Sequence, residues 1–172
     1  MKRIVALLLI TVVLMGCLVS CNKKDDTQYS TEKIPPAELT VQCGSERVTA
    51  FRGDTEWKYL IGKKKWDEEL ITNVHPLLQK DKTPCLSVAP SEELQIVTLE
   101  FDVAPIDIFV LRWDISAWNN PLAEAEDIRV NGNTFELDDK DSIYEVSARW
   151  YTNEGNQLQG TICYSFYTKK AS

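Results

Sequence analysis

Apolar and polar residues alternate with a period of two along most of the chain after residue 37. This alternation places every second side chain on one face of a β-strand, whereas an amphipathic helix would repeat about every 3.6 residues. The clearest case is segment 144–150, in which Tyr, Val, Ala and Trp alternate with Glu, Ser and Arg. Similar patterns predict further strands at 39–43, 57–61, 94–101, 106–113, 128–130, 135–137 and 162–166.

Turn residues separate these segments at fairly even spacing. The sequence Asn131-Gly132-Asn133 is a hairpin signal, and we expect 153–156 to join the last two strands. Seven to nine short strands with turns between them are typical of a sandwich. We therefore expect an all-β fold with the architecture of an immunoglobulin-like antiparallel β-sandwich.

Signals for helices are weak. We expect at most about one turn of helix at 66–70 and at 121–127. The loop at 74–78 is expected to insert Leu77 and Leu78 into the edge of the sandwich. The run 106–113 is apolar on both faces, which predicts a strand that is buried, or nearly so, on both sides.

The N-terminus departs from this pattern. Lys2 and Arg3 precede an apolar run that extends to residue 14 with Thr11 as its single polar residue, and Cys21 directly follows Ser20. A charged start, an apolar run and a small residue before the cut form an export signal. The cysteine after the small residue resembles the lipobox of bacterial lipoproteins. This resemblance implies that Cys21 is acylated and that the leader is cut before it.

Two alternatives remain for the leader. Cys17 follows Gly16, which suits the same peptidase, but Met15 is unusual one position earlier. Residues 4–22 carry no charge and are long enough for a retained membrane helix. All three interpretations place the rest of the chain outside the cytoplasm, attached to the cell membrane.

A cut before Cys21 divides the chain into a signal peptide (1–20), a lipidated cysteine with a flexible tether (21–36) and one β-domain (37–172). The tether is built mostly of Lys, Asp, Thr, Gln, Ser, Glu and Pro, so it has too little apolar surface to fold. Two acyl chains, at about 0.8 kcal/mol for each buried CH₂, would bind the lipid bilayer stably.

The charge of the chain excludes one class of partner. The predicted leader takes two of the 19 basic residues and none of the 26 acidic ones, so the formal charge falls from −7 to −9 after the cut. An acidic surface without a basic patch is repelled by nucleic acid and by anionic polymers. We therefore expect no nucleic-acid partner.

Three cysteines follow the predicted cut outside the anchor: Cys43, Cys85 and Cys163. An odd number leaves at least one thiol unpaired within the chain. Outside the cytoplasm a disulfide is permitted, and Cys43–Cys85 is the preferred pair because both flank segments that read as strand ends or loops. Cys163 lies inside a strand pattern and is interpreted as a small strand residue.

Candidate chemistry is sparse. His75, the single histidine, precedes Pro76 in a predicted loop, and no nucleophile motif such as GxSxG accompanies it. The acidic segment 138–141 has two-residue spacing like a calcium loop but lacks the glycine turn and the terminal glutamate of an EF-hand. We interpret it as a solvated turn, and leave calcium binding there open. The sequence predicts no catalytic residue, no metal site and no cofactor.

The five tryptophans carry the remaining expectation. Trp57, Trp113 and Trp150 lie in strand patterns and are expected in the core. Trp66 and Trp118 lie in predicted loops, where an exposed indole could anchor a protein partner or stack on a sugar.

Several short motifs occur in order along the mature chain: Thr-Val-Gln-Cys-Gly at 40–44, His-Pro-Leu at 75–77, Leu-Glu-Phe at 99–101 with Ala-Pro at 104–105, Arg-Trp at 112–113, Tyr-Glu-Val-Ser-Ala-Arg-Trp at 144–150 and Tyr-Ser-Phe at 164–166. In this order they resemble a domain of uncharacterised lipoproteins and some membrane-anchored proteins of clostridia-like Gram-positive bacteria. The resemblance implies a non-catalytic, extracytoplasmic, immunoglobulin-like β-domain and brings no site residues.

These observations predict a membrane-anchored extracytoplasmic lipoprotein that is not an enzyme. Its expected role is to bind an unknown protein at the interface of membrane and wall. The alternative is a module that binds carbohydrate or cell wall through its loop tryptophans.

Overall fold

The structure is a computed structural model that describes residues 35–61, 65–89, 94–137, 139–151 and 158–170. The predicted signal peptide, both candidate acylation sites and the tether up to residue 34 lie outside the described residues. The predicted hairpin loop 153–156 lies outside them as well.

The described residues form an all-β fold in which single turns of 3₁₀-helix are the helical elements. The elements in chain order are β1 (Leu39–Cys43), β2 (Glu46–Thr49), β3 (Phe51–Ile61), β4 (Lys65–Ile71), η1 (Pro76–Leu78), β5 (Cys85–Val88), β6 (Ile96–Phe101), β7 (Asp107–Asp114), η2 (Ile115–Ala117), β8 (Glu126–Ile128), β9 (Thr134–Glu136), β10 (Ser142–Trp150) and β11 (Leu158–Lys170).

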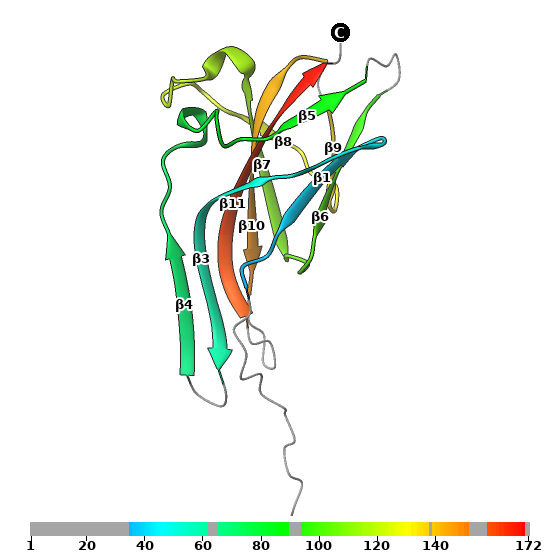
Figure 1. The fold of residues 1–172 in the computed structure, drawn as a ribbon. Coiled ribbons are helices and arrows are strands. Elements are labelled where there is room, and N and C mark those ends of the chain that lie inside the picture. Colours follow the sequence, from blue (N-terminus) through cyan, green and yellow to red (C-terminus); the bar gives the residue numbers. More distant parts are fainter. Residues whose placement is uncertain (1–34, 62–64, 90–93, 138, 152–157, 171–172) are drawn as a thin grey trace, which may run out of the picture.

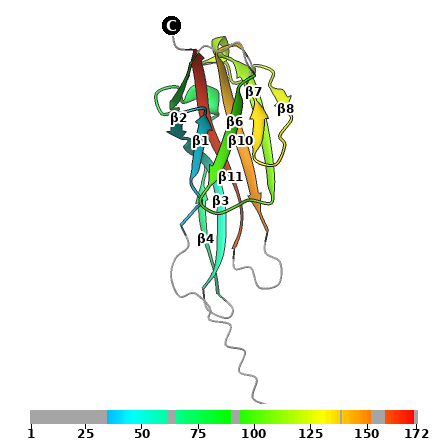
Figure 2. The same cartoon turned by 90° about the vertical axis from the view of Figure 1, so that its right-hand side faces the viewer.

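These strands make two sheets that face each other. The small sheet has the order β2-β1-β6-β9, and the large sheet has the order β4-β3-β11-β10-β7-β8. All pairings are antiparallel except that β5 runs parallel to the end of β11. Figure 2 shows β1 and β6 in front of β10 and β11, which is the two-layer arrangement of a sandwich. The all-β prediction is therefore confirmed, with eleven strands among the described residues instead of seven to nine.

The core lies between the facing sides of the two sheets, as the alternating sequence predicts. Strand β10 shows the alternation most clearly, because Tyr144, Val146, Ala148 and Trp150 are all buried on one face. The small sheet contributes its own alternating set, with Leu39 and Val41 from β1 and Val97 and Leu99 from β6. Removing this apolar surface from water is the main force that holds the layers together.

Aromatic rings form a cluster at one end of this core. Trp57 and Trp150 meet edge to face with ring centroids 5.1 Å apart. Phe101 of the small sheet contacts both Trp150 and Tyr164, at 6.0 and 5.9 Å. Such edge-to-face pairs contribute about 0.5–1.5 kcal/mol beyond their buried area. The burial of Trp57, Trp113 and Trp150 was predicted and is confirmed.

A second, smaller cluster covers part of the outer face of the large sheet. Trp113 of β7 and Ile143 of β10 are neighbours on this face, and both are buried. Leu77 of η1 is fully buried against them, and the segment around η2 completes the cover. The loops that contain η1 and η2 thus form a cap over one end of the outer face, while the rest of that face stays open.

The β3–β4 hairpin is the most prominent departure from the compact body. Figure 1 shows β3 and β4 at one edge of the large sheet, extending beyond the end of β6, at the end of the molecule opposite the C-terminus. β4 is the terminal strand of its sheet in the part of the chain that the structure describes. Its side chains are mostly exposed.

The structure corrects some of the local expectations and confirms others. Segment 66–70 is strand, within β4, and segment 121–127 contains no helix. The predicted turn forms, closed by the antiparallel bridge between Asn131 and Thr134, but the strands that flank it do not pair, because β8 pairs with β7 in the large sheet and β9 with β6 in the small one. The run 106–113 is largely buried on both faces, as expected, with Val110 in the core and Trp113 in the second cluster, although Ile106 and Phe109 are exposed. Finally, Leu77 enters the second cluster as expected, but Leu78 is exposed.

Candidate functional site

A β-bulge in β3 lies beside a cavity on the outer face of the large sheet. Thr55 lies opposite Ile162 and Arg52 lies opposite Tyr164, so Gly53 and Asp54 together oppose Cys163. A bulge of this kind bends the strand and changes the direction of a side chain. A Cβ atom on Gly53 would approach the carbonyl oxygen of Cys163 to 3.3 Å, a tight contact that glycine avoids.

Across the large sheet from this bulge, Asp54 of β3, Cys163 of β11, Glu145 of β10 and Leu111 of β7 line one cavity of about 360 Å³. The loop before and around η1 forms its other wall with Val74, His75 and Gln79. We refer to this space, between the sheet and the η1 loop, as the η1 cavity. Cavities of roughly 300–1,000 Å³ are typical of small-ligand sites.

Hydrogen bonds fix the η1 loop over the sheet. Asp54 Oδ1 accepts from the Asn73 backbone N–H at 2.6 Å, which ties the loop to the bulge. The Gln79 Nε2 group donates to the Val74 carbonyl oxygen at 2.5 Å across the loop. These two hydrogen bonds therefore fix the position of the loop that forms this wall of the cavity.

His75 has a structural role in this loop. Its Nδ1 atom accepts from the Leu77 backbone N–H at 3.2 Å, which caps the 3₁₀ turn. Its ring lies edge to face against Trp113, with centroids 5.7 Å apart. Both contacts agree with the interpretation of His75 as a loop histidine.

The Glu145 carboxyl group and the Cys163 thiol, which line the cavity, both have raised pKa values. Burial raises the pKa of Glu145, and the nearby carboxylate of Asp54 raises it further. Burial and Glu145 together raise the pKa of Cys163 to about 11, so this thiol is protonated at neutral pH. A protonated thiol is a poor nucleophile. The arrangement favours binding of a ligand over covalent chemistry at Cys163.

The raised pKa of Glu145 predicts a pH-dependent gain of stability in the Glu145→Gln variant. Ionising Glu145 is harder in the folded chain than in the unfolded one, so wild-type stability falls as pH rises from the ordinary value of 4.5 through the raised native pKa. The amide cannot ionise and escapes this loss. We therefore expect Glu145→Gln to be more stable than wild type at about pH 7.5 and to lose that advantage at about pH 4.

Urea unfolding at both pH values measures this difference. Glu46→Gln removes the same charge from an exposed position on β2 and is expected to change little at either pH. An advantage of Glu145→Gln that is equal at both pH values would show that packing, and not ionisation, is its cause.

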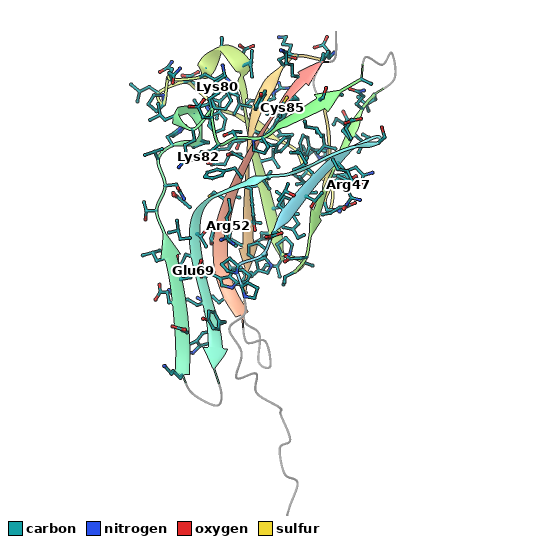
Figure 3. The ribbon with its side chains drawn as sticks, in the orientation of Figure 1. Arg47, Arg52, Glu69, Lys80, Lys82 and Cys85 are labelled. Carbon is teal, nitrogen blue, oxygen red and sulfur yellow. The ribbon has the colours of Figure 1, made fainter. Side chains whose placement is uncertain are left out.

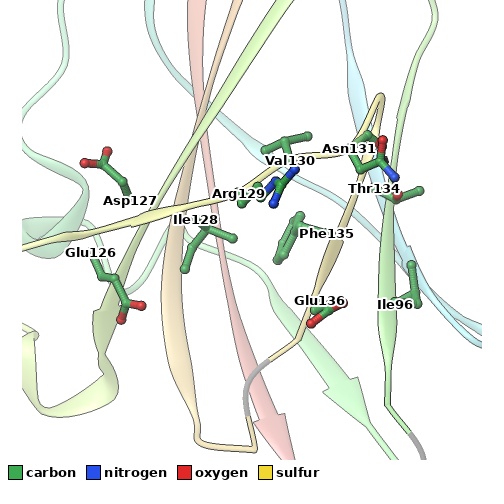
Figure 4. A pocket seen from close by; sticks show the side chains of 10 residues that line it. All are labelled: Ile96, Glu126, Asp127, Ile128, Arg129, Val130, Asn131, Thr134, Phe135 and Glu136. Atoms are coloured by element: carbon green, nitrogen blue, oxygen red, sulfur yellow. Dashed lines mark hydrogen bonds between the residues drawn. The ribbon is translucent and has the colours of Figure 1, made fainter.

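A larger cavity of about 710 Å³ opens at the other side of the sandwich, between the edges of the two sheets. Figure 4 shows its lining side chains, which come from β8, β9, β6 and the segment that joins β8 to β9. Phe135 forms its apolar floor, and Glu126, Asp127, Arg129 and Glu136 stand around it. This cavity lies where the sandwich is open, between β8 and β9, each of which is the terminal strand of its sheet in the described chain.

The two tryptophans predicted as binding residues lie in different environments. Trp66 is 46% exposed, as expected, but it lies on strand β4 and not in a loop. Trp118 follows η2 and packs into the second cluster, with its ring 5.8 Å from that of Tyr167. Its Nε1 atom is buried and has no acceptor among the described residues. Trp118 is therefore half-buried, which is less exposed than expected, and its role in binding stays a prediction.

The preferred disulfide is not formed in the structure, where Cys43, Cys85 and Cys163 are free thiols. Cys43 ends β1 with its side chain buried in the core, whereas Cys85 is on the exposed side of β5, whose Leu86 and Val88 face inward. Two cysteines whose Cβ atoms point in different directions cannot bridge without backbone movement. Figure 3 places Cys85 on β5, at the surface of the large sheet.

Residues 139–141 of the acidic segment lead directly into β10. Asp141 Oδ1 accepts from the Lys170 backbone N–H at 2.9 Å and so ties this segment to the end of β11. Asp138 lies outside the described residues. Among the residues described, no group of three or more His, Cys, Asp or Glu side chains is arranged to hold a metal ion.

Sequence reasoning missed the η1 cavity, although one signal for it was present. Gly53 interrupts an alternating strand pattern, and a glycine in that position is typical of a bulge. Glu145 was taken only as part of the polar face of its strand, and Gln79 was not considered. Their convergence depends on strand pairing and on the path of the η1 loop.

Comparison with protein-family models, with curated proteins and with solved structures found no match to this chain. The resemblance to clostridial lipoproteins therefore stays a prediction. Within the described part of the chain, no helix has the length and apolar character needed to span a bilayer.

Proposed function

We propose that this chain is an extracytoplasmic lipoprotein, anchored in the cell membrane through acylated Cys21, that acts as a protein-interaction module without catalysis. The anchor is supported by the order of charged start, apolar run, small residue and cysteine in the first 21 residues. Two facing sheets in the described chain support an immunoglobulin-like sandwich as the displayed domain.

The observation that carries the proposed binding role is the outer face of the β3–β4 hairpin. Trp66 is 46% exposed and Leu70 is 69% exposed, and both lie on the same side of β4. Large apolar side chains on a terminal strand are normally avoided, because they invite pairing with another chain. We infer that Trp66 and Leu70 anchor a partner strand or loop that lies along β4.

The charges of the hairpin indicate the chemistry of that partner. Glu68 lies on the same side of β4 as Trp66 and Leu70, whereas Lys65, Asp67 and Glu69 point to the opposite side. Figure 3 shows Glu69 on β4, where this strand lies beside the body of the large sheet. On the adjoining strand, Lys58 pairs with Glu56 at 2.6 Å and with Glu68 at 3.4 Å. The net charge remains acidic, so we expect a partner segment with basic residues around an apolar centre.

The test compares capture by the purified full chain with capture by a Trp66→Ala/Leu70→Ala variant. Membranes and wall fragments of the native host are crosslinked to each bait, and recovered proteins are quantified. Truncation of two anchors at an interface centre typically costs 2 kcal/mol or more, so we expect recovery of the partner to fall by about 30-fold or more.

Leu122→Ala is the matched control, because Leu122 is 90% exposed on the loop after η2 and lies away from the hairpin. This variant should recover the partner as well as wild type does. Both variants should also keep the wild-type unfolding temperature, since the replaced side chains are exposed. A partner that is recovered equally by all three baits would contradict the assignment of the hairpin as the binding face.

The exposed ring of Trp66 also supports the alternative of carbohydrate binding, with one exposed tryptophan instead of two. Trp66 offers one exposed stacking surface, whereas Trp118 is half-buried and its ring packs edge to face against Tyr167. Quenching of tryptophan fluorescence by wall glycan, abolished in Trp66→Ala, would favour this alternative over a protein partner.

A further inference from the structure

The part of the outer face that the cap leaves open carries an arginine held by two aromatic side chains. The Cζ atom of Arg149 lies 4.9 Å from the ring centroid of Phe109, and its Nη1 atom donates to the Tyr151 hydroxyl at 3.0 Å. Both aromatic side chains are nearly half exposed. Arg149 forms no ion pair with a described residue, including Asp107, which lies opposite it on β7. Exposed arginine and aromatic side chains are typical anchors of protein interfaces.

Strand register places Arg149 in one row with the β3–β4 hairpin. Arg149, whose neighbours on β10 are buried in the core, lies opposite Thr161 of β11, and Thr161 lies opposite Glu56 of β3. Glu56 in turn lies opposite Leu70 of β4, so the four side chains cross the outer face in a single row. Arg149 and Glu56 are therefore each one strand, about 5 Å, from β11, on opposite sides of it.

The two sides of this row have complementary chemistry. On the side of β4, Trp66 and Leu70 are exposed. The charges beside them, Glu56 and Glu68 with Lys58, are acidic in total. On the side of β7, an arginine lies beside exposed aromatic rings. This second side has the chemistry expected of the partner of the hairpin, a basic group beside apolar surface, so the chain carries both halves of a complementary pair.

We infer that two copies of this chain pack the open parts of their outer faces together, with Glu56 of each copy paired to Arg149 of the other. A two-fold axis along β11 at Thr161 exchanges the two sides of the row, so both ion pairs form at once. The same axis places β4 of each copy over β7 of the other. This inference rests on the proposed function, because it names a second copy as the partner of the hairpin.

The dimensions of the sheet are compatible with this arrangement. Sheets that pack face to face lie about 10 Å apart, a gap that an arginine and a glutamate pointing toward each other can span. Along β10, Arg149 is about 20 Å from Ile143, which belongs to the cluster under the cap. The two caps lie at the same end of the dimer, so the sheets approach most closely at the row and diverge toward the caps.

Sedimentation equilibrium of the purified full chain, in a neutral detergent matched in density to the solvent, measures this association. We expect a wild-type dimer with a dissociation constant below about 100 μM. Glu56→Arg and Arg149→Glu each replace both attractive pairs by repulsive ones, so each should weaken association by about tenfold or more. Glu46→Arg makes the same charge change as Glu56→Arg on the exposed strand β2 and should associate as wild type does.

An equal mixture of the Glu56→Arg and Arg149→Glu chains is the decisive sample, because opposite charges then meet at both pairs of a mixed dimer. We expect the mixture to associate to within about fivefold of wild type, although each variant alone associates poorly. Mixing would not repair a folding defect in either variant, so recovery would identify a direct contact between the two charges.

The inference is overturned if the wild-type chain stays monomeric up to about 500 μM, or if the mixture associates no better than its components. It is also overturned if Glu46→Arg weakens association as much as Glu56→Arg does. A monomeric wild-type chain would overturn this inference alone, because capture from host membranes tests the hairpin against other proteins separately.

Discussion

Replacing Gly160 by alanine is expected to destabilise the domain by about 3 kcal/mol, at the upper end of the usual range for overpacked sites. Gly160 lies on β11 directly between Trp57 of β3 and Trp150 of β10. A Cβ atom built on it would be 2.3 Å from the Glu56 carbonyl oxygen and 3.0 Å from the Trp57 ring. The first contact is with backbone, which cannot rotate away, so the pairing of β3 with β11 must shift.

Chemical unfolding monitored by circular dichroism measures this loss. Gly44→Ala is the control, because its Cβ would meet nothing within 4 Å but its φ of +60° is strained for alanine. It is expected to cost only about 1–2 kcal/mol. Equal losses in the two variants would mean that the close approach of Gly160 to β3 does not matter for stability.

Replacing Cys21 by alanine is expected to abolish fatty-acid attachment completely. If Cys21 is the acylated residue, its thiol forms the bond to lipid, and alanine has no group that can replace it. The measurement is metabolic labelling of host cells with an alkyne fatty acid, followed by detection on the purified chain. The wild-type chain should carry label and the Cys21→Ala chain none.

Cys17→Ala is the matched control, since it removes the other leader cysteine and should leave labelling unchanged. The reverse pattern, with label lost in Cys17→Ala and kept in Cys21→Ala, would move the anchor to Cys17. Absence of label from the wild-type chain would count against a lipoprotein and in favour of a retained membrane helix.

Much of the fold could be predicted from alternation alone, because a period of two reflects the burial of one strand face. Strand β10 follows its sequence pattern residue by residue. Strand β4 could not be predicted in this way. Its Asp67, Glu68 and Glu69 have low strand propensity, and it is a strand because β3 pairs with it along its whole length.

The alternating sequence pattern also could not show which strands pair with each other. The turn at Gly132, with φ of +63°, was predicted correctly, but the strands on its two sides belong to different sheets. A turn signal specifies local geometry and does not specify which strands bond to each other. For the same reason Asp54, Gln79 and Glu145, which line the η1 cavity and are 25 or more residues apart in sequence, could not be grouped before the sheet order was known.

The exposure of Trp66 and of Trp118 also could not be predicted from their neighbours in sequence alone. Both occur among polar residues, which predicts exposure, and only Trp66 is as exposed as predicted. Trp118 is half-buried because the segment around η2 packs its ring against Tyr167 and the second cluster. Burial by a distant part of the chain leaves no local trace in sequence.

The central claim is that the outer face of the hairpin contacts a protein partner while the chain is anchored at the membrane. The most direct measurement is photo-crosslinking in living host cells, with benzoylphenylalanine placed at position 66 or, as the control, at position 122. The account predicts a discrete protein adduct from position 66 that is absent from position 122 and is lost when Leu70→Ala is added. Equal adducts from both positions, or none from position 66, would contradict it.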